Sequence, residues 1–151
     1  MIKYFETDEK DLDRIKDLWN KLRLQHQLKS KHFSRDYENI VFEVRKQQLL
    51  KKSEKWVFKV DLVFDHDHIV GYCVSSVSND IGEIDSIYIE EKYRSVGIGD
   101  KLMKRALSWM DIMGVKNKEI LISVGNDDTI EFYNRYGFYP KHILLKQPEN
   151  D

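Results

Sequence analysis

The stretch Arg94–Gly99, which reads RSVGIG, lies between an apolar segment and an amphipathic segment. The residues before it, Ile84–Ile89, are rich in β-branched and aromatic side chains and predict a strand. A loop with two glycines that opens a helix can bind phosphate, because the first helical N–H groups are unpaired and glycine leaves them accessible. We therefore predict a phosphate-bearing ligand here. The helix is predicted from apolar residues at helical spacing, namely Ile98, Leu102, Ala106, Leu107, Met110 and Met113.

Two common phosphate-binding motifs do not fit this loop. A P-loop has four residues between its glycines and then Gly-Lys-Ser/Thr, whereas a single residue separates Gly97 from Gly99 here. A dinucleotide-binding fingerprint needs a third glycine, and Leu102 stands at that position. The loop is therefore expected to bind a different kind of phosphate ligand.

The loop resembles the acyl-CoA signature of the GNAT N-acetyltransferase superfamily, Gln/Arg-x-x-Gly-x-Gly/Ala. Arg94, Gly97 and Gly99 occupy its three defined positions. The family also has a strand before this signature and a long helix after it, as predicted here. The resemblance implies acetyl-CoA as co-substrate.

A second stretch, residues 126–138, also resembles the family. The family has an asparagine there, then a short helix with a tyrosine seven residues later, and a closing Gly-Phe pair. Asn126, Tyr133, Gly137 and Phe138 match this pattern. The resemblance implies that Tyr133 protonates the departing CoA sulfur; a merely packed tyrosine is the alternative.

The expected fold is α+β, with a central mixed, mostly antiparallel sheet flanked by helices on both faces. We expect one N-acetyltransferase domain over residues 1–146 and a flexible tail over 147–151. The predicted strands are 2–5, 56–64, 69–77, 82–89, 119–124 and 138–145, and the predicted helices are 8–27, 36–51, 98–113 and 127–136.

The resemblance also implies the cofactor contacts. Main-chain groups of one strand would contact the pantetheine part, the glycine loop would surround the pyrophosphate, and Asn126 would contact CoA as well as cap its helix. The strand residues are Ile87, Tyr88 and Ile89, and the loop residues are Arg94, Ser95, Val96, Gly97, Ile98, Gly99 and Asp100.

A general base is predicted on the strand before the loop. Glu83 lies eleven residues before Arg94, a spacing similar to that of the histone-acetyltransferase branch, where a glutamate deprotonates the amine. Asp85 lies two residues further on, and the choice between the two carboxylates stays open, as does a solvated strand start. Another branch of the family has a glutamate near Ser123, and its mechanism is not expected here.

Composition favours a small cytoplasmic enzyme. The 151 residues include 25 Lys and Arg against 26 Asp and Glu, so neither nucleic acid nor a membrane is an expected partner. Cys73 lies in an apolar strand and is expected to be a buried small side chain rather than a nucleophile. His66 and His68 lie in a polar turn and are expected to be solvated, so no metal site is predicted.

The expected function is transfer of the acetyl group of acetyl-CoA to a primary amine by direct attack in a ternary complex, with a small-molecule amine as acceptor. A protein or peptide acceptor and a non-catalytic acyl-CoA-binding regulatory domain are the alternatives, and a homodimer is left open.

Overall fold

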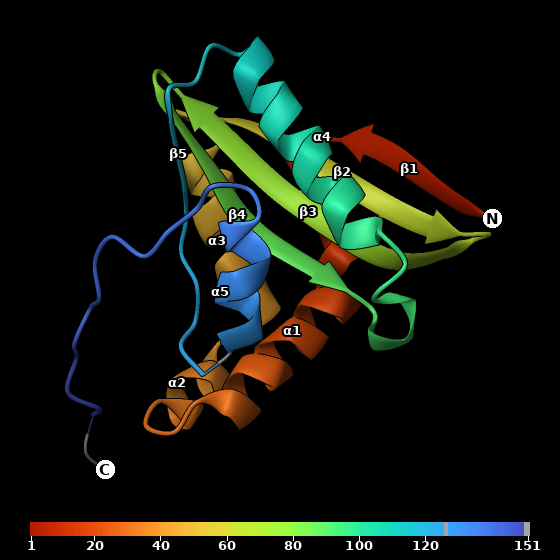
Figure 1. Cartoon of the computed structure of the whole chain (residues 1–151). Helices are drawn as coiled ribbons and strands as arrows, with labels where there is room; N and C mark the ends of the chain where they lie inside the picture. Colours follow the sequence, from red (N-terminus) through yellow and green to blue (C-terminus); the bar gives the residue numbers. More distant parts are fainter. Residues whose placement is uncertain (126, 150–151) are drawn as a thin grey trace.

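The computed structural model describes residues 1–125 and 127–149, and a five-stranded sheet forms its centre (Figure 1). The strands stand in chain order: β1 (Ile2–Thr7), β2 (Val57–Asp65), β3 (His68–Ser78), β4 (Ile81–Ile89) and β5 (Asn117–Ile120). The pairs β1–β2, β2–β3 and β3–β4 are antiparallel, whereas β4 and β5 are parallel. The predicted mixed, mostly antiparallel sheet is therefore confirmed.

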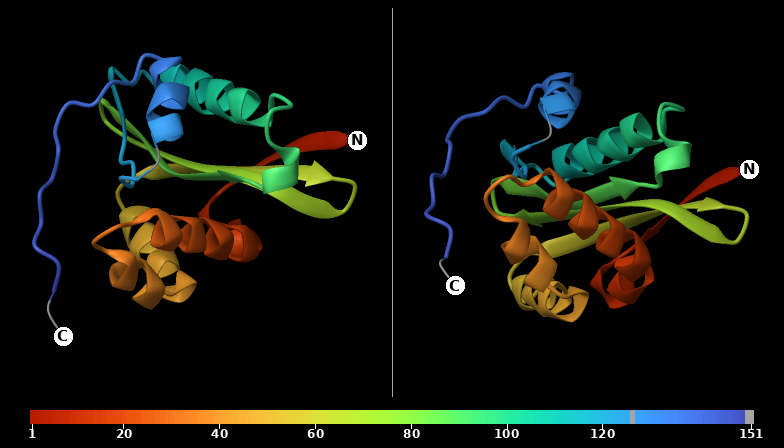
Figure 2. Two further views of the ribbon diagram at one scale, coloured as in Figure 1. Left: turned by 60° about the horizontal axis from the view of Figure 1, so that its bottom comes forward. Right: turned by 90° about the horizontal axis from the view of Figure 1, so that it is seen from below.

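Helices cover both faces of this sheet, as predicted (Figure 2). One face carries the 3₁₀ helix η1 (Glu9–Ile15) together with α1 (Lys16–Lys29), α2 (Ser34–Asn39) and α3 (Phe42–Lys52). The other face carries α4 (Ile98–Ile112), preceded by the turn η2 (Glu91–Tyr93), and α5 (Asp127–Asn134). Within the described ranges, no helix combines the length and apolar composition that crossing a membrane requires.

Two apolar clusters hold these helices on the sheet, one on each face. The predicted apolar sides of the first helix and of α4 are both buried, which confirms those two patterns. The first cluster includes Leu12, Ile15, Leu18, Trp19, Phe58, Val60 and Tyr88. The second includes Cys73, Ile84, Ile98, Leu102, Ala106, Met110 and Tyr133.

The predicted helix Asp36–Lys51 is two helices in the structure. The chain is extended at Ile40 and Val41, which separate α2 from α3, and β-branched residues favour that conformation. The predicted apolar side is also wrong, because Val41 is 55% exposed while α3 buries Phe42 and Leu49. The break therefore changes which side of α3 faces the sheet.

The predicted strand 119–124 is wrong in extent, and the predicted strand 138–145 is absent from the structure. β5 ends at Ile120 rather than at Val124, and from Phe138 onward the described chain has neither helix nor strand. Ile143 and Leu145 are 79% and 89% exposed. A strand requires a neighbour for its backbone N–H and C=O groups, and the chain after Ile120 leaves the sheet, so the adjoining edge is missing (Figure 1).

A buried ion cluster fixes α4 on the sheet. Asp61 on β2 is 1% exposed, and its Oδ1 accepts hydrogen bonds from Nε and Nη2 of Arg105 at 3.1 and 2.9 Å. Its Oδ2 accepts from Lys59 Nζ at 2.8 Å. Because a buried charge without a partner is costly, this cluster disfavours sliding of α4 along β2 and thereby positions the start of α4.

Candidate active site

The sheet opens between β4 and β5. The two strands pair only as far as Ile84 and Ile120, and beyond that point no described strand lies on this side of β4, whereas β3 continues on its other side. The chain after β5 crosses to α2, where Tyr37 Oη donates a hydrogen bond of 2.7 Å to Ser123 Oγ. The stretch Asp85–Ile89 therefore has an edge without a strand partner, and it includes the three residues predicted to contact pantetheine.

A β-bulge at Asp85 decides which side chains face which side of the sheet. Ser75 pairs with Ile84 and Val74 pairs with Ser86, so Asp85 is the extra residue of β4. Asp85 and Ser86 consequently face the same side, the one covered by α1 and α3. Strict alternation would have put them on opposite faces.

Both candidate bases meet one lysine at the end of α3. Lys52 Nζ donates hydrogen bonds to Glu83 Oε2 and to Asp85 Oδ1, the second at 2.6 Å. Ser76 Oγ on β3 donates to Asp85 Oδ2 at 2.6 Å. The Asp85 side chain is 2% exposed and that of Glu83 is 27% exposed, so Glu83 is the more accessible carboxylate.

Burial perturbs the titration of Asp85. It raises the pKa of Asp85 to about 6, against the opposing effect of the hydrogen bonds from Lys52 and Ser76, and the charge of Glu83 adds to the rise. A carboxylate with such a pKa is ionised at neutral pH and still accepts a proton readily, which suits a general base. The pKa of Asp85 is therefore compatible with a role as general base.

Tyr133 lies on the other face of the sheet. It is 5% exposed and belongs to the same apolar cluster as Cys73 and Ile84, with its ring edge-on to Phe132 and Phe138 at 5.1 and 6.4 Å between centroids. Burial, together with the nearby Cys73 thiol, raises the pKa of Tyr133, so the hydroxyl keeps its proton at neutral pH. It forms no hydrogen bond with the residues that the structure describes. Among the described residues, none competes with an incoming group for this proton.

The candidate acid and the candidate base are separated by the sheet itself. Glu83 contacts α3 on one face, while Tyr133 packs under α4 on the other. Cys73, the neighbour of Tyr133, pairs with Ile87 of β4, which places Tyr133 over the stretch that lacks a strand partner. Glu83 itself pairs with Glu119 of β5, but Lys52 connects its carboxylate to that of Asp85, the first residue of the open stretch.

The glycine loop leaves α4 with an uncapped N-terminus. Ser95 and Gly97 have left-handed backbones, with φ of 68° and 91°, and the cap position provides no side-chain hydrogen bond. The Asp100 carboxylate is bound elsewhere, since it accepts from Tyr136 Oη at 2.5 Å and pairs with Lys104 Nζ at 2.9 Å. The first N–H groups of this 15-residue helix are therefore available to an anion.

The two glycines of the loop have different surroundings. A Cβ atom at Gly99 would lie 3.1 Å from Ile89 and 3.3 Å from the Phe132 ring, so Gly99 allows α4 to pack closely against β4 and α5. At Gly97, a Cβ atom would meet no described atom within 4 Å. Gly97 is thus the position of the loop at which a phosphate group has room to approach.

We expect Gly97→Ala to weaken CoA binding by at least about tenfold, because the new methyl group takes space where a phosphate would approach the amides. The matched control is Gly114→Ala at the other end of α4, where φ is 79° and the surroundings are equally open. Each change should reduce the free energy of unfolding by about 1–2 kcal/mol through backbone strain. Calorimetric titration with CoA checks the prediction: equal affinities of the two variants would contradict it.

The remaining residues predicted to contact CoA differ in where the structure places them. Arg94 lies along β4 rather than at the helix start, with Nε donating to the Ile89 carbonyl at 2.8 Å and its guanidinium 5.1 Å from the Tyr88 ring centroid. Val96 is 70% exposed, whereas Ile98 is buried and offers only its backbone. Asn126 lies outside the described residues.

Two basic residues of the candidate site were not predicted from the sequence. Arg45 Nη2 donates to the Asp85 carbonyl at 3.3 Å, and Lys52 binds both carboxylates. They are seven residues apart, so they lie on one side of α3, two turns apart. That spacing is visible in the sequence, but only the break before Phe42 shows that this side of the helix faces β4.

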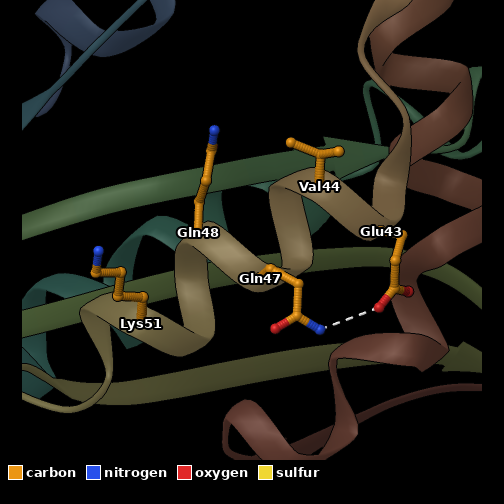
Figure 3. Close-up of a pocket in the computed structure, with 5 residues that line it drawn as sticks. All are labelled: Glu43, Val44, Gln47, Gln48 and Lys51. Carbon is orange, nitrogen blue, oxygen red and sulfur yellow. Dashed lines mark hydrogen bonds between the residues drawn. The ribbon is translucent and has the colours of Figure 1, made fainter.

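A shallow hollow of about 380 Å³ lies on the outer side of α3 (Figure 3). In it, Gln47 Nε2 donates to Glu43 Oε1 at 3.0 Å. None of the predicted site residues lines it; the lining residues are Glu43, Val44, Gln47, Gln48 and Lys51. The candidate site is therefore the open edge of β4 and not this hollow.

Comparison with protein families gives a match to the acetyltransferase (GNAT) family over residues 15–138. This range contains Glu83, Asp85, the glycine loop and Tyr133.

Two curated relatives match about three fifths of the chain. An uncharacterized N-acetyltransferase of Methanocaldococcus jannaschii is 29% identical over 110 residues, which cover 62% of this chain and 49% of the relative. Mycothiol acetyltransferase of Corynebacterium efficiens is 30% identical over 101 residues, which cover 64% of this chain and 34% of the relative. The matched part thus spans half or less of the length of these relatives.

Among solved structures, the PaiA N-acetyltransferase of Thermoplasma acidophilum in complex with coenzyme A has a TM-score of 0.72 to this chain. It is 18% identical, and the alignment covers 93% of this chain and 91% of that one. This likeness concerns the fold.

Proposed function

Because the chain belongs to the acetyltransferase (GNAT) family, we propose that it transfers the acetyl group of acetyl-CoA to a primary amine. The proposed reaction is a direct attack of the amine on the thioester while both substrates are bound. The observation that carries the proposal is the opening of the sheet beyond Ile84, where Asp85 begins the open stretch with Glu83 close to it on one face, and a buried, protonated tyrosine lies on the other face.

The binding of acetyl-CoA is supported by the edge Asp85–Ile89, which has no strand partner on one side, and by the uncapped start of α4. The edge offers peptide groups to the amides of the pantetheine arm, and the helix start offers N–H groups and a positive dipole to the pyrophosphate. The space at Gly97 is compatible with a phosphate there. The coenzyme A in the PaiA structure is in keeping with this proposal.

The proposed roles of the side chains follow from their positions. Glu83, the more exposed carboxylate, takes a proton from the ammonium form of the acceptor. The amine nitrogen then bonds to the thioester carbon, the carbon–sulfur bond breaks, and the nitrogen loses its second proton to solvent, from which Tyr133 later regains a proton. Tyr133 gives its proton to the departing sulfur, and its raised pKa keeps that proton in place until then. Asp85 holds Lys52 beside Glu83.

We propose a small-molecule amine as acceptor, supported by the two carboxylates that would attract a protonated amine to the site. A screen of polyamines, amino acids, aminoglycosides and peptide N-termini, measured by release of free CoA, tests the proposal. The proposal would be overturned if none of these classes of amine caused release of free CoA.

We expect acetyl-CoA to raise the melting temperature of the protein. A ligand that binds only the folded state at about 100 times its Kd adds about 2.7 kcal/mol of stability. NAD and ATP carry phosphates but no pantetheine arm, so at equal concentration they should raise the melting temperature much less. Equal shifts with all three ligands, measured by differential scanning fluorimetry, would contradict the assignment to acyl-CoA.

A further inference from the structure

The ammonium group of Lys52 lies in a cage of carboxylates and aromatic rings. Besides its hydrogen bonds to Glu83 and Asp85, Lys52 Nζ lies 4.2 Å from the centroid of the Trp56 ring and 5.9 Å from that of Phe58. Carboxylates and the faces of aromatic rings are the two kinds of group that attract an alkylammonium ion most strongly. The cage is thus suited to bind an alkylammonium ion, and the ammonium group of Lys52 already occupies it.

The walls of this cage are fixed by contacts that do not involve Lys52. Asp85 is held by the hydrogen bond from Ser76 and by its position in the β-bulge. Phe58 is 6% exposed in the core, and Trp56 packs against the same cluster. Removal of the lysine side chain should therefore leave the cage in place.

The side chain of Lys52 can leave the cage. Lys52 is the last residue of α3, and its side chain is 22% exposed. Its flexible four-carbon stem can therefore turn outward into solvent. Glu83, the proposed base, is 27% exposed at the same opening, so an incoming ammonium would replace that of Lys52 directly beside the base.

We propose that this cage is the acceptor subsite, and that it takes the ammonium group of an unbranched aliphatic primary amine, with Lys52 as the internal occupant that the acceptor displaces. The identity of the acceptor rests on the proposed acetyl transfer, whereas the binding of an ammonium ion does not. Amines with a carboxylate on the adjacent carbon, such as amino acids, are excluded because a third negative charge would lie against Glu83 and Asp85.

The test uses Lys52→Ala and n-butylamine, an unbranched primary amine whose four-carbon chain has the length of the whole lysine side chain. Without acetyl-CoA, n-butylamine should bind Lys52→Ala at least fivefold more tightly than it binds the wild type, measured by isothermal titration calorimetry. The matched control is Lys51→Ala, whose lysine is exposed and lines the outer hollow, and it should behave like the wild type. n-Butanol, the neutral analogue, should bind none of the proteins.

Equal n-butylamine binding by all three proteins, or equal binding of n-butanol and n-butylamine by Lys52→Ala, would overturn the ammonium subsite. If Lys52→Ala does not fold, Lys52→Gln replaces it, since its neutral amide still donates hydrogen bonds to the carboxylates. With acetyl-CoA added, Lys52→Ala should form N-butylacetamide with a KM at least fivefold below that of the wild type. Tight binding without this product would retain the ammonium site and overturn its assignment to the acceptor.

Discussion

Replacing Tyr133 with phenylalanine should lower kcat by about ten- to a thousandfold and leave the Kd for CoA nearly unchanged. The change keeps the ring, and with it the contacts to Phe132 and Phe138, but removes the hydroxyl proton. Because that hydroxyl bonds to no described residue, its loss leaves no partner unsatisfied, and the fold should be stable. A lower kcat would therefore report on proton donation and not on packing.

The control for this prediction is Tyr139→Phe. Tyr139 is 71% exposed, so its hydroxyl can be removed without an effect on the site. Steady-state kinetics and calorimetry on both variants separate turnover from CoA affinity. Full kcat in a folded Tyr133→Phe protein would show that the tyrosine only packs and that the sulfur is protonated by solvent.

The sheet and α4 were predictable because their signals are local. Alternating or continuous apolar residues fix the strands, and α4 has an unbroken apolar side from Ile98 to Met110. The helix break at Ile40 was not predictable, because Ile40 and Val44 fit helical spacing as well as Phe42 and Leu49 do. Contact with the sheet, a tertiary property, decides which of the two sides is buried.

The site was predictable as a set of motifs but not as an arrangement. The glycine loop and Tyr133 were found because their residue types and spacing resemble a family pattern. Lys52 was missed because a lysine at the end of a helix is normally solvated, and its position depends on the bulge at Asp85. The location of the candidate acid and the candidate base on opposite faces follows from the packing of α3 and α5 on opposite faces of the sheet, which no local pattern predicts.

Glu83→Gln should lower kcat/KM by about a hundred- to ten-thousandfold, the usual contribution of a general base. The glutamine keeps the shape of the side chain but cannot take a proton from the acceptor. Raising the pH should partly restore the activity, because more of the amine then binds already deprotonated. Activity that stays equally low up to the pKa of the acceptor would indicate that Glu83 supports the structure of the site instead.

Asp85→Asn decides whether the base is Glu83 or its neighbour. If Asp85 is the base, kcat/KM of the wild type should fall as the pH drops through about 6, where its carboxylate becomes protonated. Because the charge of Glu83 raises the pKa of Asp85, Glu83→Gln should then move this limb to lower pH and leave a larger activity than Asp85→Asn does. With Glu83 as the base, the order is reversed: Asp85→Asn retains the larger activity, and its loss arises from the weaker attraction of the acceptor's ammonium group. The pH profile of the two variants thus assigns the proton acceptor, and the proposed acid role of Tyr133 is compatible with either assignment.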